Sequence, residues 1–353
     1  MKKIIDKLYQ QHNLSKEEWI ALFDNRTPEL EAYLFALARK VTAKTYGNKI
    51  FIRGLIEFSN YCKNDCFYCG IRHSNKNLSH YRLSEEEILN CCEIGYASGY
   101  RTFVLQGGED PYFTRERMVH IIKDIHANYP DCAITLSIGE RSFLDYQAFF
   151  DAGADRYLLR HETFLDSHYQ KLHPQAMSSA NRKECLFNLK KIGYQTGSGF
   201  MVGSPYQTNE NLAEDMLFIK KLSPEMVGIG PYISHKDTPF HEMPSGSVSK
   251  TLFILGLLRL MMPTLLIPST TALGALDKDG RLLGIKCGAN VLMQNITPQS
   301  ARINYTLYEN KDRAGDADNT MNNPLFTELL NDGYKITTTR GDALVSEGEE
   351  KNV

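Results

Sequence analysis

Apolar and polar positions follow two periods along this chain. Short apolar runs with the length of buried strands recur between residues 50 and 295, and stretches with apolar residues at helical spacing lie between them. The predicted strands are residues 50–58, 102–106, 133–138, 155–160, 195–203, 226–233, 264–270 and 289–295. This alternation predicts an α/β fold and favours a (β/α)8 barrel of the TIM type over residues 48–330. A doubly wound open sheet would show the same alternation, so periodicity alone does not distinguish an open sheet from a barrel.

The two ends of the chain are expected to lie outside this repeat. Residues 1–47 predict a helical N-terminal extension, in which Ser15 is a helix N-cap with Glu18 three positions later and a further helix ends at Gly47. Residues 331–353 are polar and acidic, and we expect a tail of no chemical consequence.

Composition narrows the class of protein. The chain has 353 residues, 42% of them apolar and 23% charged, as in a soluble globular protein. Its net charge of −2 gives no electrostatic reason to expect nucleic acid or an anionic membrane as partner. The longest apolar run, residues 251–268, contains Arg259 and Pro263, which favours a buried helix leading into a strand over a membrane span. The N-terminus lacks the apolar region of a signal peptide, so we expect a cytoplasmic protein.

Three cysteines follow the first predicted strand in C-x3-C-x2-C spacing: Cys62, Cys66 and Cys69. In a parallel barrel this places three thiolates on the face where functional groups gather. Three thiolates can ligate three irons of a 4Fe-4S cluster and leave the fourth iron open to a small molecule. The alternatives are a coincidence of spacing and a zinc site with a remote fourth ligand, which His73 could supply. The other five cysteines predict buried apolar positions: Cys91, Cys92, Cys132, Cys185 and Cys287.

The cysteine spacing, with aromatic Tyr68 directly before the last cysteine, resembles the signature of the radical S-adenosylmethionine (SAM) superfamily. The resemblance implies that the amine and carboxylate of SAM bind the open iron. It also implies that an electron from the cluster cleaves SAM to a 5′-deoxyadenosyl radical, which requires an electron donor and anaerobic conditions.

The same resemblance assigns SAM contacts to residues that follow the other strands. The stretch "LQGGEDPY" resembles the superfamily's GGE motif, which contacts the methionine amine, although alone it would be read as a glycine turn. The carboxylate of Glu162 suits the ribose diol, and the guanidinium of Arg182 suits the methionine carboxylate. For each of these charges the alternative is a salt bridge at the rim of the barrel. Met201 could pack against the adenine of SAM or belong to the hydrophobic core. The residues so assigned are Tyr68, Gly107, Gly108, Glu109, Ser137, Glu162, Arg182 and Met201.

A narrower resemblance covers residues 48–310. The stretches "CGIRHSNKNL", "LLRHET", "PSTTALG" and "KCGANVLMQNITP" resemble FeFe-hydrogenase maturases of the HydE type, which are relatives of biotin synthase and methylornithine synthase. This resemblance implies hydrogenase maturation proteins as partners. It also implies a cysteine-bound iron carbonyl–cyanide precursor as the substrate from which the dithiolate bridge is made.

One departure from that family concerns its accessory cluster. Many HydE-type proteins carry three further cysteines near the C-terminus, whereas this chain has none after Cys287. We therefore expect no second cluster.

The substrate is expected to lie deeper in the barrel than SAM. Two interior arginines would attract an anionic substrate, with a buried ion pair as the alternative for each. The candidate substrate residues are Arg53, Arg156, Thr270, Thr271, Tyr305 and Tyr308. Two other functions stay open: a radical SAM amino-acid mutase such as methylornithine synthase, and a non-enzymatic zinc-binding barrel.

Overall fold

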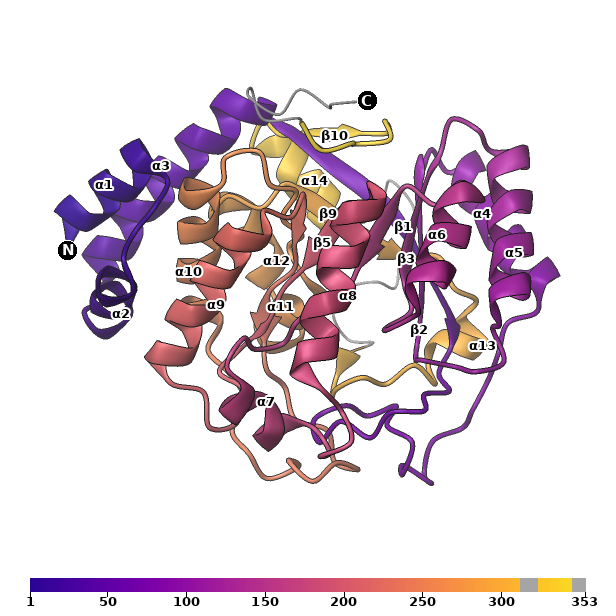
Figure 1. Cartoon of the computed structure of the whole chain (residues 1–353). Coiled ribbons are helices and arrows are strands. Elements are labelled where there is room, and N and C mark those ends of the chain that lie inside the picture. The colour runs from indigo at the N-terminus through magenta and orange to yellow at the C-terminus, as the bar shows by residue number, and fades with distance from the viewer. Residues whose placement is uncertain (312–322, 345–353) are drawn as a thin grey trace.

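The computed structural model describes residues 1–311 and 323–344, and it is a barrel of parallel strands covered by helices (Figure 1). Within the described residues the main sheet has eight strands in the order β10-β1-β2-β3-β4-β5-β7, with β9 also paired to β1. Every pairing in it is parallel. The strands are β1 (Lys49–Ser59), β2 (Thr102–Gly107), β3 (Ala133–Ser137), β4 (Arg156–Leu158), β5 (Gln195–Ser198), β7 (Met226–Val227), β9 (Val291–Asn295) and β10 (Lys335–Thr337).

The predicted strand at residues 264–270 closes the barrel without forming a regular strand. The amide of Val227 donates to the Leu266 carbonyl at 3.2 Å, and the amide of Ser269 donates to the Val291 carbonyl at 2.9 Å. Pro268 has no N–H to give, so the ladder is interrupted there. Because this segment joins β7 to β9, the doubly wound open sheet is excluded and the barrel prediction is confirmed.

Two predicted strands are divided in the structure. The fifth becomes β5 and β6 (Met201–Val202), and the sixth becomes β7 and β8 (Gly230–Pro231), with β6 paired to β8 in a separate small sheet. The division falls where the backbones approach closely, because a Cβ on Gly199 would lie 1.9 Å from the Gly228 carbonyl oxygen.

Helices cover the outside of the sheet. They are α4 (Glu85–Ala97), α5 (Arg115–Asn128), α6 (Phe143–Asp151), α7 (Asp166–Leu172), α8 (Ser179–Ile192), α9 (Asn209–Leu222), α10 (Val248–Met261), α11 (Thr271–Leu276), α12 (Gly280–Lys286), α13 (Gln299–Arg302) and α14 (Pro324–Asn331). The five cysteines outside the C-x3-C-x2-C loop are all buried, as predicted.

The long apolar run forms α10, which is buried on every side from Thr251 to Met261. Its buried charge, Arg259, donates to the carbonyls of Gly288 at 2.8 Å and Pro263 at 2.7 Å. Among the described residues no helix combines the length and apolar character that a bilayer crossing requires.

The N-terminal extension consists of α1 (Lys2–Gln11), α2 (Lys16–Asp24) and α3 (Pro28–Tyr46), which lie together at one side of the barrel (Figure 1). The predicted cap is present, because the Ser15 hydroxyl accepts from the Glu18 amide and the Glu18 carboxylate accepts from the Ser15 amide. Helix α3 ends at Gly47, whose φ of 63° suits glycine. Helices α1 and α3 pack on α10, and α2 packs on α9, in one hydrophobic core with the barrel.

Residues 331–344 differ from the expected tail, whose remaining residues, 345–353, lie outside the described part of the chain. Strand β10 pairs with the first residues of β1, Lys49 to Phe51, and residues 340–342 pass beneath the barrel. The segment is polar because it forms ion pairs there, as described below.

Candidate active site

The cysteine loop begins where β1 ends, at the C-terminal end of the barrel. Its start is fixed by Ser59, whose hydroxyl donates to the buried Asp110 carboxylate at 2.6 Å. Its far side rests on the segment that follows α13, where the Gly70 amide donates to the Leu307 carbonyl at 2.9 Å. A Cβ on Gly70 would lie 2.0 Å from the Thr306 carbonyl oxygen, so only glycine permits this approach.

The three thiols of this loop are free and partly exposed. Burial raises the pKa of all three, to about 12 for Cys66, where the nearby Arg182 charge opposes the effect. A cationic metal centre would reverse that shift, because it stabilises thiolates.

The spacing of the three loop sulfurs is compatible with a cluster. Among the described residues, one group of at least three His, Cys, Asp or Glu side chains has all its ligand atoms within 4.8 Å of one another, and it is Glu85, His120 and Asp124 on α4 and α5. Thiolates on one tetrahedral zinc stand only about 4 Å apart, since each Zn–S bond is about 2.3 Å. The three loop sulfurs do not all lie within 4.8 Å of one another, which is compatible with ligands of separate irons. His73 is exposed and its backbone pairs with Asn64.

The GGE segment lies directly on the cysteine loop. A Cβ on Gly108 would stand 2.2 Å from the Tyr61 carbonyl oxygen and 2.7 Å from Cβ of Cys62. The Lys63 amide donates to the Glu109 carbonyl at 3.0 Å, and the Lys63 ammonium is 3.1 Å from the Glu109 carboxylate. The cysteine loop after β1 and the GGE segment after β2 therefore lie in direct contact.

A network of charges surrounds Glu109. Its carboxylate accepts from the Glu140 amide at 2.9 Å and lies 3.9 Å from the Arg182 guanidinium. Arg182 also pairs with the Glu140 carboxylate and donates to the Arg160 carbonyl at 3.0 Å. Glu140 was not predicted as a site residue, although it stands just after the third strand, where rim residues are expected.

The remaining predicted SAM contacts lie on the same face. Glu162 has a φ of 63°, is 3.2 Å from the Arg160 guanidinium, and lies within electrostatic reach of Cys66 and Cys69. Met201 belongs to an apolar cluster with Leu172, Tyr232 and Phe240, against which Tyr68 packs. Ser137 ends β3 opposite Gln106 of β2.

The orientation of Tyr68 is set by His173, which sequence reasoning did not single out. Nδ1 of His173 is 2.9 Å from the Tyr169 carbonyl oxygen, which can only accept, so this nitrogen carries the proton. Nε2 then accepts from the Tyr68 hydroxyl at 3.1 Å. Burial lowers the pKa of His173 to about 3, which keeps the ring neutral.

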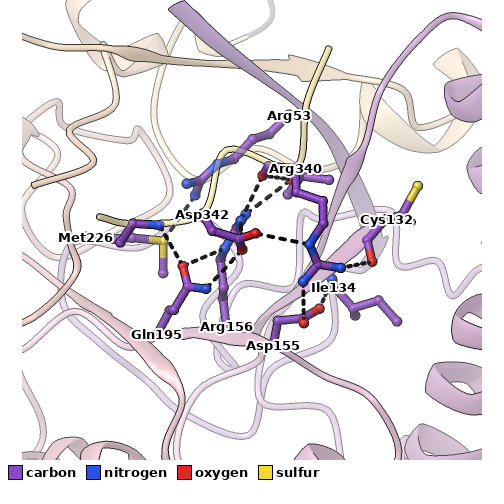
Figure 2. Close-up of polar contacts among 11 residues, drawn as sticks. Arg53, Cys132, Ile134, Asp155, Arg156, Gln195, Met226, Arg340 and Asp342 are labelled. Carbon is purple, nitrogen blue, oxygen red and sulfur yellow. Dashed lines mark hydrogen bonds and ion pairs between the residues drawn. The ribbon is translucent and has the colours of Figure 1, made fainter. Parts of the chain in front are cut away.

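At the opposite end of the barrel, Arg156 is fully enclosed by structural partners (Figure 2). Its guanidinium donates to the Asp342 carboxylate at 2.7 Å and the Arg340 carbonyl at 2.8 Å. It also donates to Thr102 at 3.1 Å and Gln195 at 3.2 Å, residues that begin β2 and β5. This is the ion-pair alternative, so the expected substrate role of Arg156 is corrected to closing the base of the barrel.

Arg53 also lies near the base but is only partly satisfied (Figure 2). Nη1 is 3.1 Å from the sulfur of Met226, whereas Nε and Nη2 are buried without a hydrogen-bond partner among the described residues. Burial, together with the Arg156 charge, lowers the pKa of Arg53.

The other predicted substrate residues are buried or half-buried. The hydroxyls of Thr271 and Tyr308 are 2.7 Å apart, and Thr270 donates to the Ile229 carbonyl at 3.3 Å. Tyr305 is fully buried with the Lys311 ammonium 5.0 Å above its ring.

An interior ion pair between Glu57 and Lys311 was missed. The two atoms Oε1 and Nζ are 2.6 Å apart, and the Glu57 side chain has no exposed area. Period-two alternation from Arg53 along the first strand would have placed Glu57 on the same face.

Comparisons with known proteins agree with this geometry. Residues 56–219 match the model of the radical SAM superfamily. The chain is 45% identical over 278 residues to the [FeFe] hydrogenase maturase subunit HydE of Thermotoga maritima, covering 79% of each chain. It is 29% identical over 300 residues to the 3-methylornithine synthase of Methanosarcina acetivorans, covering 84% of each.

Among solved structures, the crystal structure of methylornithine synthase (PylB) superposes with a TM-score of 0.83 at 27% identity, covering 95% of this chain and 97% of that one. Family membership implies a 4Fe-4S cluster and SAM, and Cys62, Cys66 and Cys69 fit the cluster motif. The chain belongs to the radical SAM superfamily as an enzyme related to the HydE-type maturase.

Proposed function

We propose that this enzyme takes part in assembling the diiron site of FeFe-hydrogenase. The observation that carries the proposal is the 45% identity with the Thermotoga maritima maturase over 79% of both chains. The substrate would be a small cysteine-bound iron carbonyl–cyanide precursor held in the barrel, and hydrogenase maturation proteins would be partners.

In this proposal Cys62, Cys66 and Cys69 hold the cluster, and each remaining residue binds or orients. The cluster, when bound, supplies the electron that cleaves SAM to a 5′-deoxyadenosyl radical. Glu109 would bind the methionine amine and Arg182 the methionine carboxylate, and Glu162 would bind the ribose hydroxyls. Tyr68 and Met201 would enclose the adenine. The buried barrel beneath them excludes water from the reacting groups.

Anaerobic reconstitution tests the first part of this proposal. We expect uptake of about four irons per chain, with no second cluster, because the chain has no cysteine after Cys287. Cleavage of SAM under dithionite is expected to follow. A colourless protein with one zinc and no SAM cleavage would support the zinc-barrel alternative instead.

The second part is tested in cells. A host that lacks its own HydE-type maturase and expresses FeFe-hydrogenase should regain hydrogen evolution when this chain is supplied, and a Cys62→Ala variant should not restore it.

A radical SAM mutase is the second candidate, because the fold superposes over almost the whole length of methylornithine synthase. Incubation with L-lysine, SAM and reductant distinguishes the two functions. Formation of 3-methylornithine would establish the mutase, whereas its absence together with rescue of hydrogenase would establish the maturase.

A further inference from the structure

The pair formed by Glu57 and Lys311 occupies the interior of the barrel close to the cysteine loop. Glu57 lies on β1 five residues before Cys62. Phe51 on the same strand packs against Met226 and Leu266, which lie across the barrel, so its face of β1 is the interior one. Side chains alternate along a strand, which puts Glu57 on this interior face.

The carboxylate of Glu57 sits in a built binding site for a cation. Asn295 on the neighbouring strand β9 donates to Oε2 at 2.7 Å and so fixes the plane of the carboxylate. Oε1 is 2.6 Å from the Lys311 ammonium, and the Tyr305 ring faces the same ammonium at 5.0 Å. A carboxylate and an aromatic face together are a common way to bind an ammonium group.

The occupant of this site comes from far along the chain. Lys311 lies in the segment after α13 that also supplies Tyr305 and Tyr308, and a surface hollow lined by Asn75, His235 and Lys311 opens beside it. Lysine reaches Glu57 through a flexible four-carbon stem, and its head group is a primary ammonium, the same group that an amino acid carries.

From this arrangement we infer that Glu57 is the recognition site for the ammonium group of an amino-acid substrate, and that Lys311 occupies the site when the substrate is absent. The substrate ammonium takes the place of Nζ on the Glu57 carboxylate, so the charge of the buried carboxylate stays balanced throughout. The inference rests on the proposed function only in placing the substrate inside the barrel.

The test uses two ligands that differ only in the ammonium group. S-methyl-L-cysteine and 3-(methylthio)propanoate are titrated by anaerobic calorimetry into the reconstituted enzyme with SAM bound. The wild-type enzyme is expected to bind the amino acid at least tenfold more tightly. Glu57→Gln should lose this preference, and Lys311→Met should bind the amino acid more tightly than wild type, because the internal competitor is gone.

Two further variants keep the test independent of folding. Glu57→Gln combined with Lys311→Met leaves no unpaired charge and should melt near the wild-type temperature while lacking the preference. Glu225→Gln removes a carboxylate that pairs with Lys190 at the same 2.6 Å but outside the interior, and it should keep the preference. Equal affinity of wild type for both ligands, no binding of either, or an unchanged preference in Glu57→Gln would overturn the inference.

Failure of this inference is distinguishable from failure of the proposed function. An enzyme that cleaves SAM and restores hydrogenase but ignores the ammonium group overturns only the inference. An enzyme that shows the ammonium preference but does not restore hydrogenase overturns only the maturase proposal.

Discussion

Gly108 and Tyr61 touch through their backbones: a Cβ on Gly108 would lie 2.2 Å from the Tyr61 carbonyl oxygen. The contact joins the end of β2 to the cysteine loop that follows β1. The cysteine loop and the GGE segment are thereby held at a fixed spacing, because no side chain separates the two backbones.

Replacing Gly108 with alanine should push the cysteine loop away. Because the new Cβ meets backbone rather than a flexible side chain, we expect a loss of about 1–3 kcal/mol in the free energy of unfolding and lower iron content after reconstitution. Iron analysis and thermal melting measure both. Gly228→Ala is the matched control, since its Cβ would meet nothing closer than 3.7 Å; equal effects in the two variants would contradict the contact.

Alanine substitution should divide the cysteines into two classes, those required for the cluster and those not required for it. Replacing Cys62, Cys66 or Cys69 with alanine should abolish both the cluster absorbance and SAM cleavage, because each thiolate would hold a different iron. Alanine at the buried Cys91 or Cys132 should leave both intact and lower stability by only about 1 kcal/mol. Retention of a full cluster in any of the first three variants would show that the ligand set is wrong.

Arg182→Lys should weaken SAM binding. The planar guanidinium of Arg182 pairs with Glu140 and lies 3.9 Å from Glu109, and the ammonium of lysine cannot reproduce that planar geometry. We expect a loss of about tenfold or more in SAM affinity, since a hydrogen bond to a charged group contributes about 1.5–3 kcal/mol. Equilibrium binding of SAM to the reconstituted protein measures it. Arg115→Lys, in a more exposed pair with Asp145, should bind SAM normally.

Asp342→Asn should destabilise the base of the barrel in a pH-dependent way. Burial alone would raise the pKa of Asp342, but the Gln195 hydrogen bond and the Arg156 and Arg340 charges outweigh it and lower the pKa to about 2. This folded-state pKa is below the unfolded value of about 3.9, so the carboxylate stabilises the fold above about pH 4 and that contribution is lost as pH falls toward 2.

Thermal melting of cluster-free protein checks this prediction. At pH 7 the Asp342→Asn variant should be less stable by about 1–2 kcal/mol, a value kept small because Asp342 is half exposed. The difference from wild type should shrink steadily below about pH 4. A difference that is the same at pH 3 and pH 7 would show that the Asp342 charge is not what holds Arg156.

The cysteine chemistry and the order of strands and helices could be predicted from local sequence. The C-x3-C-x2-C spacing lies within eight residues, and strand and helix periods are properties of short windows, so neither depends on distant parts of the chain. The Ser15 cap and the end of α3 at Gly47 were readable for the same reason.

Pairings between distant residues were decided only by the tertiary structure. Arg156 meets Asp342 across 186 positions, which turns an expected substrate residue into part of the barrel base and an expected tail into its partner. Glu57 meets Lys311 in the same way at the other end. Periodicity gives the face on which a charge lies, but the partner that balances a buried charge is set by which segments the closed barrel brings together.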